Sequence, residues 1–396
     1  MRFSDYFLLT EGGNVEAINF LGKSKFADKI DLGRIKIKNF RTEFSQLFLD
    51  LNKKFKSKFK YPLWGDENII KSGFVFNGST SYIMDPNINA DEILKFKTHA
   101  GDIDIMVPSE SMSDLWLLLR DLEGKKIGKN FTYFGNNKPN QNALGTQINA
   151  IFVFHHPSGD INCQIDFEAS DFENNRPTDF AKFGHGSSFD DARVEIKALH
   201  HKYLLRCLVS VVSANPNIIV ATPASTAEKI KLKKTQDTPK MYGFSVDRGL
   251  GYSLEPIIGK DGKIVEIDGK QVYKEKKTDE KKYIKDLSEI FRFLFNTDEN
   301  FSKFYSFVGL VDLLKLYCDK ETIKNVQKSY FRLLFGDKSQ VIELYDPKSD
   351  CIVKMKGYNY FLEKLNLKHP NLDNDVNHYY EVRKNAFRKN QLNYQK

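Results

Sequence analysis

Three aspartates in the first half of this sequence could together hold divalent cations. Asp102 and Asp104 are separated by one residue at the start of an apolar run, and Asp166 lies in a later segment of alternating polarity. In a β-strand, residues two apart point to the same side, so Asp102 and Asp104 would project together. Carboxylate oxygens suit Mg²⁺, and two such ions can activate an attacking hydroxyl and stabilise a leaving pyrophosphate. The pattern therefore predicts a metal site for phosphoryl transfer.

A glycine-serine turn ahead of the aspartate pair could bind phosphate. Gly78, Ser79 and Thr80 follow a predicted strand at 73–76 and begin a predicted helix. Backbone N–H groups at the start of a helix attract anions, and the two hydroxyls add further donors. We therefore expect this turn to contact the phosphates of a nucleotide.

The elements that must position these residues are predicted from hydrophobic spacing. Apolar residues recur at helical intervals between Phe44 and Phe59, which predicts a helix over 40–57. Polar and apolar residues alternate over 161–168, which predicts a half-buried strand with Asp166 on its polar face. The other elements expected here are strands at 73–76, 103–107 and 147–155 and a helix at 111–122.

The second half of the chain has a different composition. Residues 225–280 are rich in lysine and glycine and contain two hairpin signals, Asp261-Gly262 and Asp268-Gly269. Beyond residue 281 the pattern is helical, so the whole chain is predicted to be α+β. The helices expected from residue 188 onward are 188–212, 281–296, 301–318 and 321–335.

The conjunction of motifs resembles the DNA polymerase beta-like nucleotidyltransferase superfamily. The resemblance rests on Gly78-Ser79, the Asp102 and Asp104 pair, and Asp166, and it covers roughly residues 40–215. It implies a palm-like mixed sheet with flanking helices, followed here by a β-hairpin insert and a C-terminal helical domain. One departure is the long interval between Ser79 and Asp102, which would place an insertion over the site.

The pattern along the chain also predicts a domain order. The expected parts are an N-terminal arm (1–39), a catalytic domain (40–215), a basic β-hairpin insert (216–280) and a helical domain (281–396).

The activity implied by the resemblance is Mg²⁺-dependent nucleotidyl transfer from an NTP, with ATP favoured, to an acceptor hydroxyl. Asp102 and Asp104 would hold two Mg²⁺ ions, for which Mn²⁺ could substitute. Asp166 would complete the metal site and orient or deprotonate the acceptor. Gly78 and Ser79 would hold the β- and γ-phosphates.

Related enzymes commonly use a basic residue after the third carboxylate to hold the triphosphate. Lys197 is the first candidate and Arg193 the second, because both fall on the helix expected over 188–212. With His201 they would form one basic stripe at helical spacing. A solvent-facing stripe paired with Glu195 or Asp190 is the alternative.

Basic segments suggest a nucleic-acid acceptor. The clusters lie at 53–60, 229–240, 274–285 and 383–396, several of them interleaved with aromatic residues. An RNA such as a tRNA 3′ end is the favoured acceptor. The alternatives are a protein-nucleotidylating or small-molecule transferase, and a non-catalytic virion or binding protein on the same fold.

Composition narrows the class of protein. The 396 residues carry a formal net charge of +8 and only four cysteines, none of them in a paired motif, which argues against a disulfide scaffold. No segment approaches the ~20 apolar residues of a membrane span, so a cytoplasmic protein is expected. Leu9-Thr10-Glu11-Gly12 resembles the cleavage site of phage prohead proteases, which would place the protein in the host cytoplasm or the virion.

Overall fold

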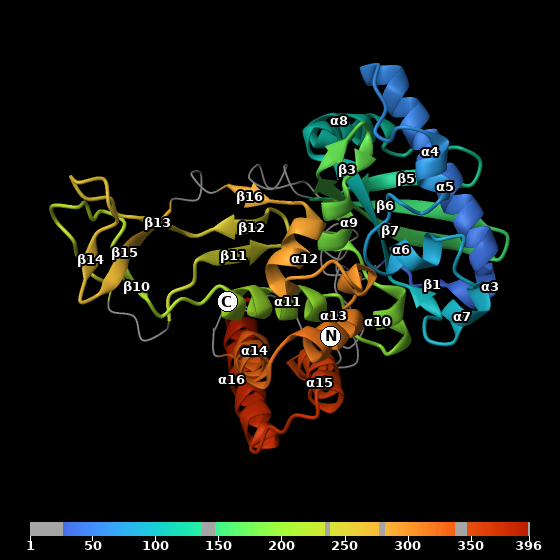
Figure 1. The fold of residues 1–396 in the computed structure, drawn as a ribbon. Coiled ribbons are helices and arrows are strands. Elements are labelled where there is room, and N and C mark those ends of the chain that lie inside the picture. The colour runs from blue at the N-terminus through green and yellow to red at the C-terminus, as the bar shows by residue number, and fades with distance from the viewer. Residues whose placement is uncertain (1–26, 137–146, 234–237, 277–281, 337–346, 395–396) are drawn as a thin grey trace. The chain divides into compact units, whose positions relative to one another are not determined.

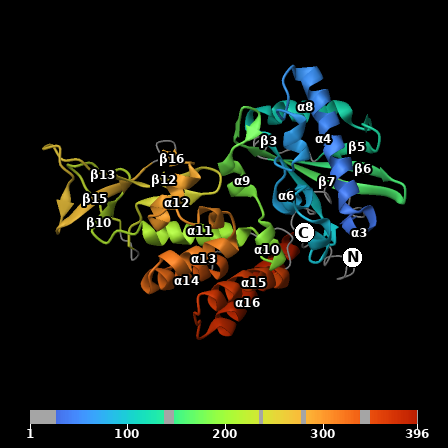
Figure 2. The same ribbon diagram turned by 45° about the vertical axis from the view of Figure 1, so that its right-hand side comes forward.

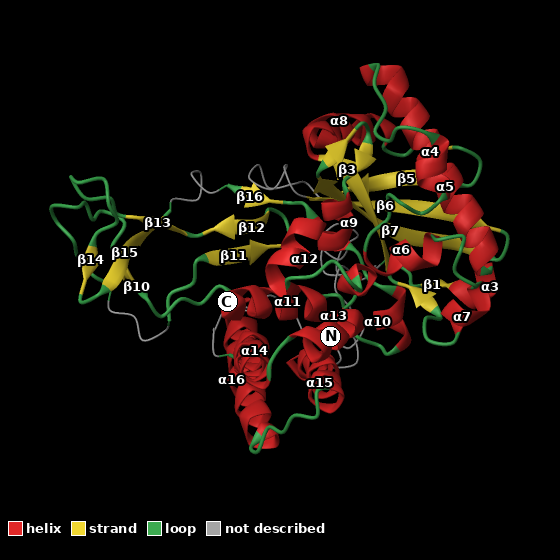
Figure 3. Cartoon of the chain, viewed as in Figure 1, coloured by secondary structure: helices red, strands yellow, loops and turns green. Residues whose placement is uncertain are grey.

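The computed structural model describes residues 27–136, 147–233, 238–276, 282–336 and 347–394. Helices and strands are both abundant and the sheets mix parallel with antiparallel pairs, which confirms the predicted α+β class (Figure 3). Among the described residues, unit 1 comprises 27–198, 347–357 and 370–394, and unit 2 comprises 199–336 and 358–369. None of the described helices is both long and apolar enough to cross a membrane.

A five-stranded sheet forms the centre of unit 1. Its order is β3-β7-β6-β5-β4, in which β3 and β7 run parallel and the other neighbours run antiparallel. The strands expected at 103–107, 147–155 and 161–168 correspond to β3, β6 and β7. The strands are β3 (Asp102–Pro108), β4 (Lys126–Ile127), β5 (Phe131–Asn136), β6 (Gln147–His156) and β7 (Gly159–Ser170).

Helix α4 (Ile37–Phe59) packs along this sheet and supplies much of its core (Figures 1 and 2). Phe44 contacts the ring of Phe131 in β5, and Phe48 contacts the ring of Phe167 in β7. Burial of such aromatic side chains contributes a large share of the stability of a domain. The helix predicted over 40–57 is therefore confirmed, and so is the one over 111–122, which is α8 (Met112–Leu122).

The approach to β3 differs from the prediction. The strand expected at 73–76 does not form, because Gly73 turns the chain at φ +78 directly after α5 (Glu67–Lys71). Only Phe76 bridges to Ile105. Helix α6 (Gly78–Met84) then begins at the glycine-serine turn.

The interval between the turn and β3 is ordered structure. It contains α7 (Ala90–Leu94) and β2 (His99–Ala100). β2 pairs with β1 (Ile30–Asp31), which leads into α3 (Leu32–Ile35). Residues 27–36, expected in the N-terminal arm, are thus part of the unit 1 core, whereas residues 1–26 and the sequence around Glu11 lie outside the described residues.

The single helix predicted over 188–212 is wrong. The chain forms α10 (Phe189–Arg193), then a turn in which Glu195 adopts φ +57, and then α11 (Leu199–Val212). A residue in the left-handed region cannot continue a right-handed helix. The expected basic stripe of Arg193, Lys197 and His201 therefore does not exist.

Short elements complete unit 1. A hairpin and a helix follow β7, and two long helices come from the C-terminal part of the chain. These elements are β8 (Phe172–Glu173), β9 (Arg176–Pro177), α9 (Asp179–His185), α15 (Pro347–Lys364) and α16 (Leu372–Tyr394); α15 continues from unit 1 into unit 2 after residue 357.

Unit 2 contains the predicted hairpins and most of the later helices. Asp268 and Gly269 both adopt positive φ between β14 and β15, which confirms that hairpin. The helix expected from 281 begins later, because Asp286 caps its N-terminus and the preceding residues form β16. The strands are β10 (Ile218–Ala221), β11 (Tyr242–Ser245), β12 (Gly249–Tyr252), β13 (Leu254–Pro256), β14 (Glu266–Ile267), β15 (Lys270–Glu275) and β16 (Tyr283–Ile284). The later helices are α12 (Leu287–Phe295), α13 (Phe307–Tyr317) and α14 (Lys320–Phe335), with a 3₁₀ turn at Phe301–Tyr305.

The division into units does not follow the predicted domains. The boundary lies after residue 198 rather than after 215, and the segment expected to be one helical domain contributes to both units. A sequence read in order cannot reveal such a return of the chain, because hydrophobic periodicity reports local structure only.

Candidate active site

The pairing of β3 with β7 brings the three aspartates together. Asp104 lies directly opposite Asp166 in the parallel register, and Asp102 lies opposite Gln164. One carboxylate oxygen from each of Asp102, Asp104 and Asp166 lies within 4.8 Å of the others. The expectation that their side chains converge is met. The arrangement offers an oxygen-rich set of ligands to a hard cation such as Mg²⁺.

The aspartate cluster is electrostatically unfavourable when it carries no cation. Burial raises the pKa of Asp166 well above its usual value, and the neighbouring Asp104 and Asp102 raise it further. Burial also raises the pKa of Asp102, although Lys97 and Lys197 act in the opposite direction. Burial and like charge both disfavour the ionised form of a carboxyl group. A bound cation would relieve both effects.

The polar face of β7 is more deeply buried than predicted. Gln164 is 1 % exposed and Asp166 is 2 % exposed, so this strand is covered on both sides. The amide of Gln164 donates to both carboxylate oxygens of Asp166, at 3.0 and 3.1 Å. These hydrogen bonds fix the orientation of Asp166.

Gly78 lies directly against the aspartate cluster. It adopts φ +52, and a Cβ at this position would lie 2.2 Å from Oδ2 of Asp104. The N–H of the preceding Asn77 donates to the carbonyl oxygen of Asp104 at 3.0 Å. Only glycine satisfies both the backbone conformation and the close approach. The turn thus positions Asp104.

Thr80 was expected to contact the phosphates of a nucleotide, but its role in the structure is different. Its side chain is fully buried, and its hydroxyl hydrogen-bonds the backbone of Asp102 and Asp104 in β3. The hydroxyl therefore holds the strand that carries the aspartates and does not face a ligand. Ser79, by contrast, lines a cavity beside the cluster.

This cavity has a volume of about 670 Å³ and lies within unit 1. Lys197 and Ser79 both line it, which brings two of the predicted nucleotide-binding residues together. Its volume is in the range of small-molecule and cofactor sites. The charged lining residues are Lys29, Lys97, Lys197, Lys356 and Glu195, and the rings of Tyr82 and Phe96 form part of its apolar wall.

Arg193 does not join this group. It forms an ion pair with Asp190 on the surface, and its guanidinium lies over the ring of Phe189, 5.2 Å from the centroid. Arg193 is not among the residues that line the cavity. The alternative predicted for Arg193, a surface pair with an acidic neighbour, describes it better.

Two polar residues beside the cluster were not predicted as functional. The amide of Asn77 donates to Oε2 of Glu168 at 2.6 Å, while Oδ1 of Asn77 is buried and has no hydrogen-bond partner among the described residues. Glu168 raises the pKa of both Asp102 and Asp166 as a further like charge. The position of Glu168 two residues after Asp166 on the same strand face was the signal available in the sequence.

The Gly-rich turn before α10 packs against the glycine-serine turn. Gly186 bridges to Gly78, and the hydroxyl of Ser81 donates to the carbonyl of Ser187 at 3.2 Å. Ser187 and Ser188 line the same cavity as Ser79. Two separate loops therefore meet beside the aspartates.

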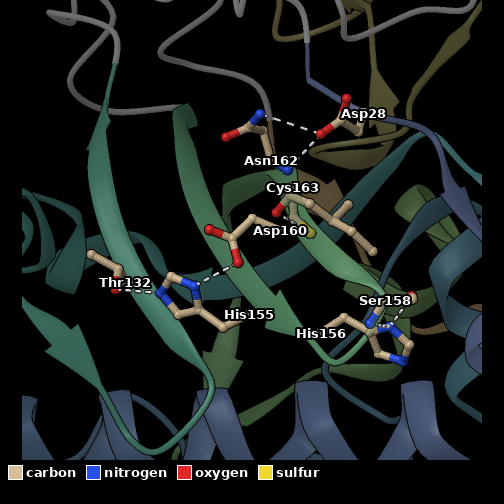
Figure 4. A network of polar contacts seen from close by, with 9 residues as sticks. Asp28, Thr132, His155, His156, Ser158, Asp160, Asn162 and Cys163 are labelled. Atoms are coloured by element: carbon tan, nitrogen blue, oxygen red, sulfur yellow. Dashed lines mark hydrogen bonds and ion pairs between the residues drawn. The ribbon is translucent and has the colours of Figure 1, made fainter.

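A second polar network lies at the far end of β7 and is independent of the aspartate cluster. Figure 4 shows His155 between two partners, the hydroxyl of Thr132 at 2.8 Å and the carboxylate of Asp160 at 2.9 Å. His155 and Asp160 are cross-strand neighbours in the β6–β7 hairpin. The network joins strand ends at the surface, where the side chain of Asp160 is 64 % exposed.

The basic segments are partly neutralised by acidic neighbours. Lys233 pairs with Glu275, and Lys274 pairs with Glu255. Lys231 is exposed, whereas Lys234 and the last residues of the chain lie outside the described part.

Comparison with known proteins does not assign the chain to a family. No protein family model, no curated protein and no solved structure matches this chain significantly.

Proposed function

We propose that this protein is a Mg²⁺-dependent nucleotidyltransferase of the DNA polymerase beta-like type. The observation that carries the proposal is the convergence of Asp102, Asp104 and Asp166 within 4.8 Å on parallel strands, with Gly78 packed against Asp104. This combination matches the motif order of that superfamily, and the adjoining cavity has room for a nucleotide.

The residues present fit a divalent cation. The donor set consists of carboxylate oxygens, and burial together with mutual repulsion disfavours the cluster without a positive charge. Asp102 and Asp104 would hold both ions and Asp166 would hold one. When bound, Mg²⁺ would supply the positive charge that activates an acceptor hydroxyl and stabilises the departing pyrophosphate.

The side chains of this protein would then contribute mainly by positioning. Asp166, held by Gln164, would orient the acceptor hydroxyl and accept its proton on a carboxylate oxygen. Ser79 and Lys197 would bind the triphosphate of the NTP in the cavity. Such fixed charges and donors stabilise the transition state without reorganising during the reaction.

Nucleotidyl transfer can be tested with labelled substrates. The full chain would be incubated with each α-³²P-labelled NTP, Mg²⁺ or Mn²⁺, and separate pools of RNA, DNA, protein and metabolites. We expect label to enter one pool with ATP as the preferred donor. Absence of transfer and of pyrophosphate release from all four NTPs would favour a non-catalytic protein on this fold.

RNA is the proposed acceptor, supported by the exposed basic residues of the segment 229–240. Each lysine that neutralises a phosphate of single-stranded RNA steepens the salt dependence of log affinity by about 0.7. We expect a slope of roughly −2 to −3, which Lys231→Gln flattens by about 0.7. Label in the protein or metabolite pool, with no salt-dependent RNA binding, would identify one of the other acceptor classes.

A further inference from the structure

Four lysines from separate segments converge on the cavity beside the aspartates. Lys29 precedes β1, Lys97 precedes β2, Lys197 follows α10, and Lys356 lies in α15. Lys97 and Lys197 are close enough to Asp102 to lower its pKa, so the basic wall adjoins the carboxylate cluster. A cavity with this charge suits a ligand that carries several negative charges.

One carboxylate lies within this basic wall. Glu195 lines the cavity and forms an ion pair with Lys356. Its backbone adopts φ +57, and it is held there by hydrogen bonds from the N–H of Glu195 to Ala192 and from the N–H of Ile196 to Asp191. A non-glycine residue in this conformation is uncommon and is often found where function requires a fixed position.

We propose that Lys356 is a triphosphate-binding residue and that it forms an ion pair with Glu195 in the nucleotide-free protein. On binding, the terminal phosphates of an NTP would replace the carboxylate of Glu195 as the partner of Lys356. The inference rests on the proposed function and adds to it a residue from the C-terminal part of the chain, about 190 residues after Asp166.

Replacement of the Glu195 carboxylate by phosphate as the partner of Lys356 is energetically favourable. The side chains of Lys356 and Glu195 are 48 % and 60 % exposed, and ion pairs of that exposure contribute little to stability. A triphosphate carries several charges and many acceptor oxygens, whereas Glu195 offers one charge. Charge-assisted hydrogen bonds from lysine to phosphate are among the stronger polar contacts in proteins.

Two substitutions should therefore act in opposite directions. Lys356→Gln removes a phosphate ligand, so the affinity for a triphosphate should fall about tenfold, the loss expected for one hydrogen bond to a charged group. Glu195→Gln removes the competing carboxylate, so the affinity should rise about threefold, the scale of an exposed ion pair. The gain from Glu195→Gln should vanish when Lys356 is already glutamine, because there is no ion pair left to break.

The test is isothermal titration of the full chain in Mg²⁺ with the non-reactive α,β-methylene analogue of ATP and with AMP. Lys364→Gln is the matched control, since Lys364 lies on the same helix, pairs with Glu363 and does not line the cavity. We expect Lys356→Gln to weaken the triphosphate about tenfold and to leave AMP within about twofold. Lys356→Arg, which keeps the charge, should bind within a few-fold of the wild type.

Three results would overturn the inference. They are wild-type affinity in Lys356→Gln, equal losses for AMP and the triphosphate, and a gain from Glu195→Gln that persists in the double variant. If Lys356→Gln does not fold, the affinities of Lys356→Arg and Glu195→Gln provide the test. Unchanged triphosphate affinity in Glu195→Gln would contradict the replacement of Glu195 by phosphate as the partner of Lys356. Should the wild type bind neither compound while folded, the proposed function falls as well, whereas failure of the variants alone leaves nucleotidyl transfer standing.

Discussion

Both units of this protein bury adjacent titratable side chains, but in different ways. In unit 2, His200 and His201 are at most 5 % exposed and each has a hydrogen-bond partner, Tyr330 for His200 and the carbonyl of Phe304 for His201. Burial lowers the pKa of His201 to about 4, so the ring is neutral at pH 7.

The buried aspartates of unit 1 present the opposite case. Asp166 is as deeply buried, yet its nearest titratable neighbours are two further carboxylates that raise its pKa. A neutral histidine with a partner is compatible with a stable core, whereas converging carboxylates are stable together only with a proton or a cation between them. Convergence of like charge, rather than burial, is therefore what marks a candidate functional site here.

The largest effect should come from breaking the aspartate cluster. Asp104→Asn removes one cation-binding charge, so nucleotidyl transfer should fall by about a thousandfold or more, because metal stabilisation amounts to several kcal/mol. Transfer of labelled nucleotide measures this loss. Asp160→Asn is the control on the neighbouring strand, since Asp160 bonds His155 at the far end of β7 (Figure 4). Equal transfer activity in Asp104→Asn and Asp160→Asn would mean that Asp104 has a structural role.

The histidine pair predicts an acid-sensitive unit 2. The pKa of His201 is lowered in the folded state, so the unfolded chain binds the additional proton between about pH 6.5 and pH 4. Stability should therefore fall as the pH drops through this window, by on the order of 3 kcal/mol. Hydrogen exchange of the α11 amides measures the loss. His201→Asn keeps a donor for the carbonyl of Phe304 and should show a shallower pH dependence; an unchanged slope would contradict the argument.

Alanine substitutions at two glycines can separate the effect of backbone strain from the effect of crowding the aspartate cluster. Gly78 and Gly124 both have positive φ, and alanine at either position should cost about 1–2 kcal/mol of stability. Only at Gly78 would the new methyl group meet the carboxylate of Asp104, because nothing lies within 4 Å of a Cβ at Gly124. We expect Gly78→Ala to lose transfer activity and Gly124→Ala to retain it. Thermal unfolding and the transfer assay, run together, distinguish the two effects.

The smallest predicted effect concerns the pH dependence of metal-free unit 1. The pKa of Asp166 is raised in the folded state, so its stabilising contribution is present below the unfolded pKa and is lost as the pH rises through the folded pKa. Asp166→Asn should therefore stabilise the metal-free protein at pH 7. Denaturation followed by the fluorescence of Trp64 and Trp116, the two tryptophans of the sequence, measures this change, because both lie in unit 1. Mg²⁺ should stabilise the wild type more than the variant.

Local pattern predicted much of the fold of unit 1. The alternation around Asp166 and the apolar run after Asp102 identified β7 and β3, and the spacing of aromatic residues identified α4. Because residues two apart share a strand face, the convergence of the aspartates followed from the two strands being neighbours.

Other parts of the site depend on contacts that local pattern does not report. The turn at Glu195 interrupts an otherwise helical pattern without glycine or proline, so a continuous helix was predicted. The contribution of Lys356 to the cavity requires α15 to return to unit 1 after the chain has formed most of unit 2. Lys97 lies in a segment that was predicted as an insertion over the site but had no assigned element.

Divalent-cation binding is the most direct test of whether Asp102, Asp104 and Asp166 form a metal site. Mn²⁺ can be titrated into the full chain in the presence of the α,β-methylene analogue of ATP, with binding followed by electron paramagnetic resonance. We expect saturable Mn²⁺ binding to the wild type and to Asp160→Asn, and competition by Mg²⁺. Binding to Asp104→Asn and to Asp166→Asn should be at least tenfold weaker, about 1.4 kcal/mol for each lost carboxylate. Equal Mn²⁺ affinity in the wild type and Asp104→Asn, or no binding to the folded wild type, would contradict this metal site.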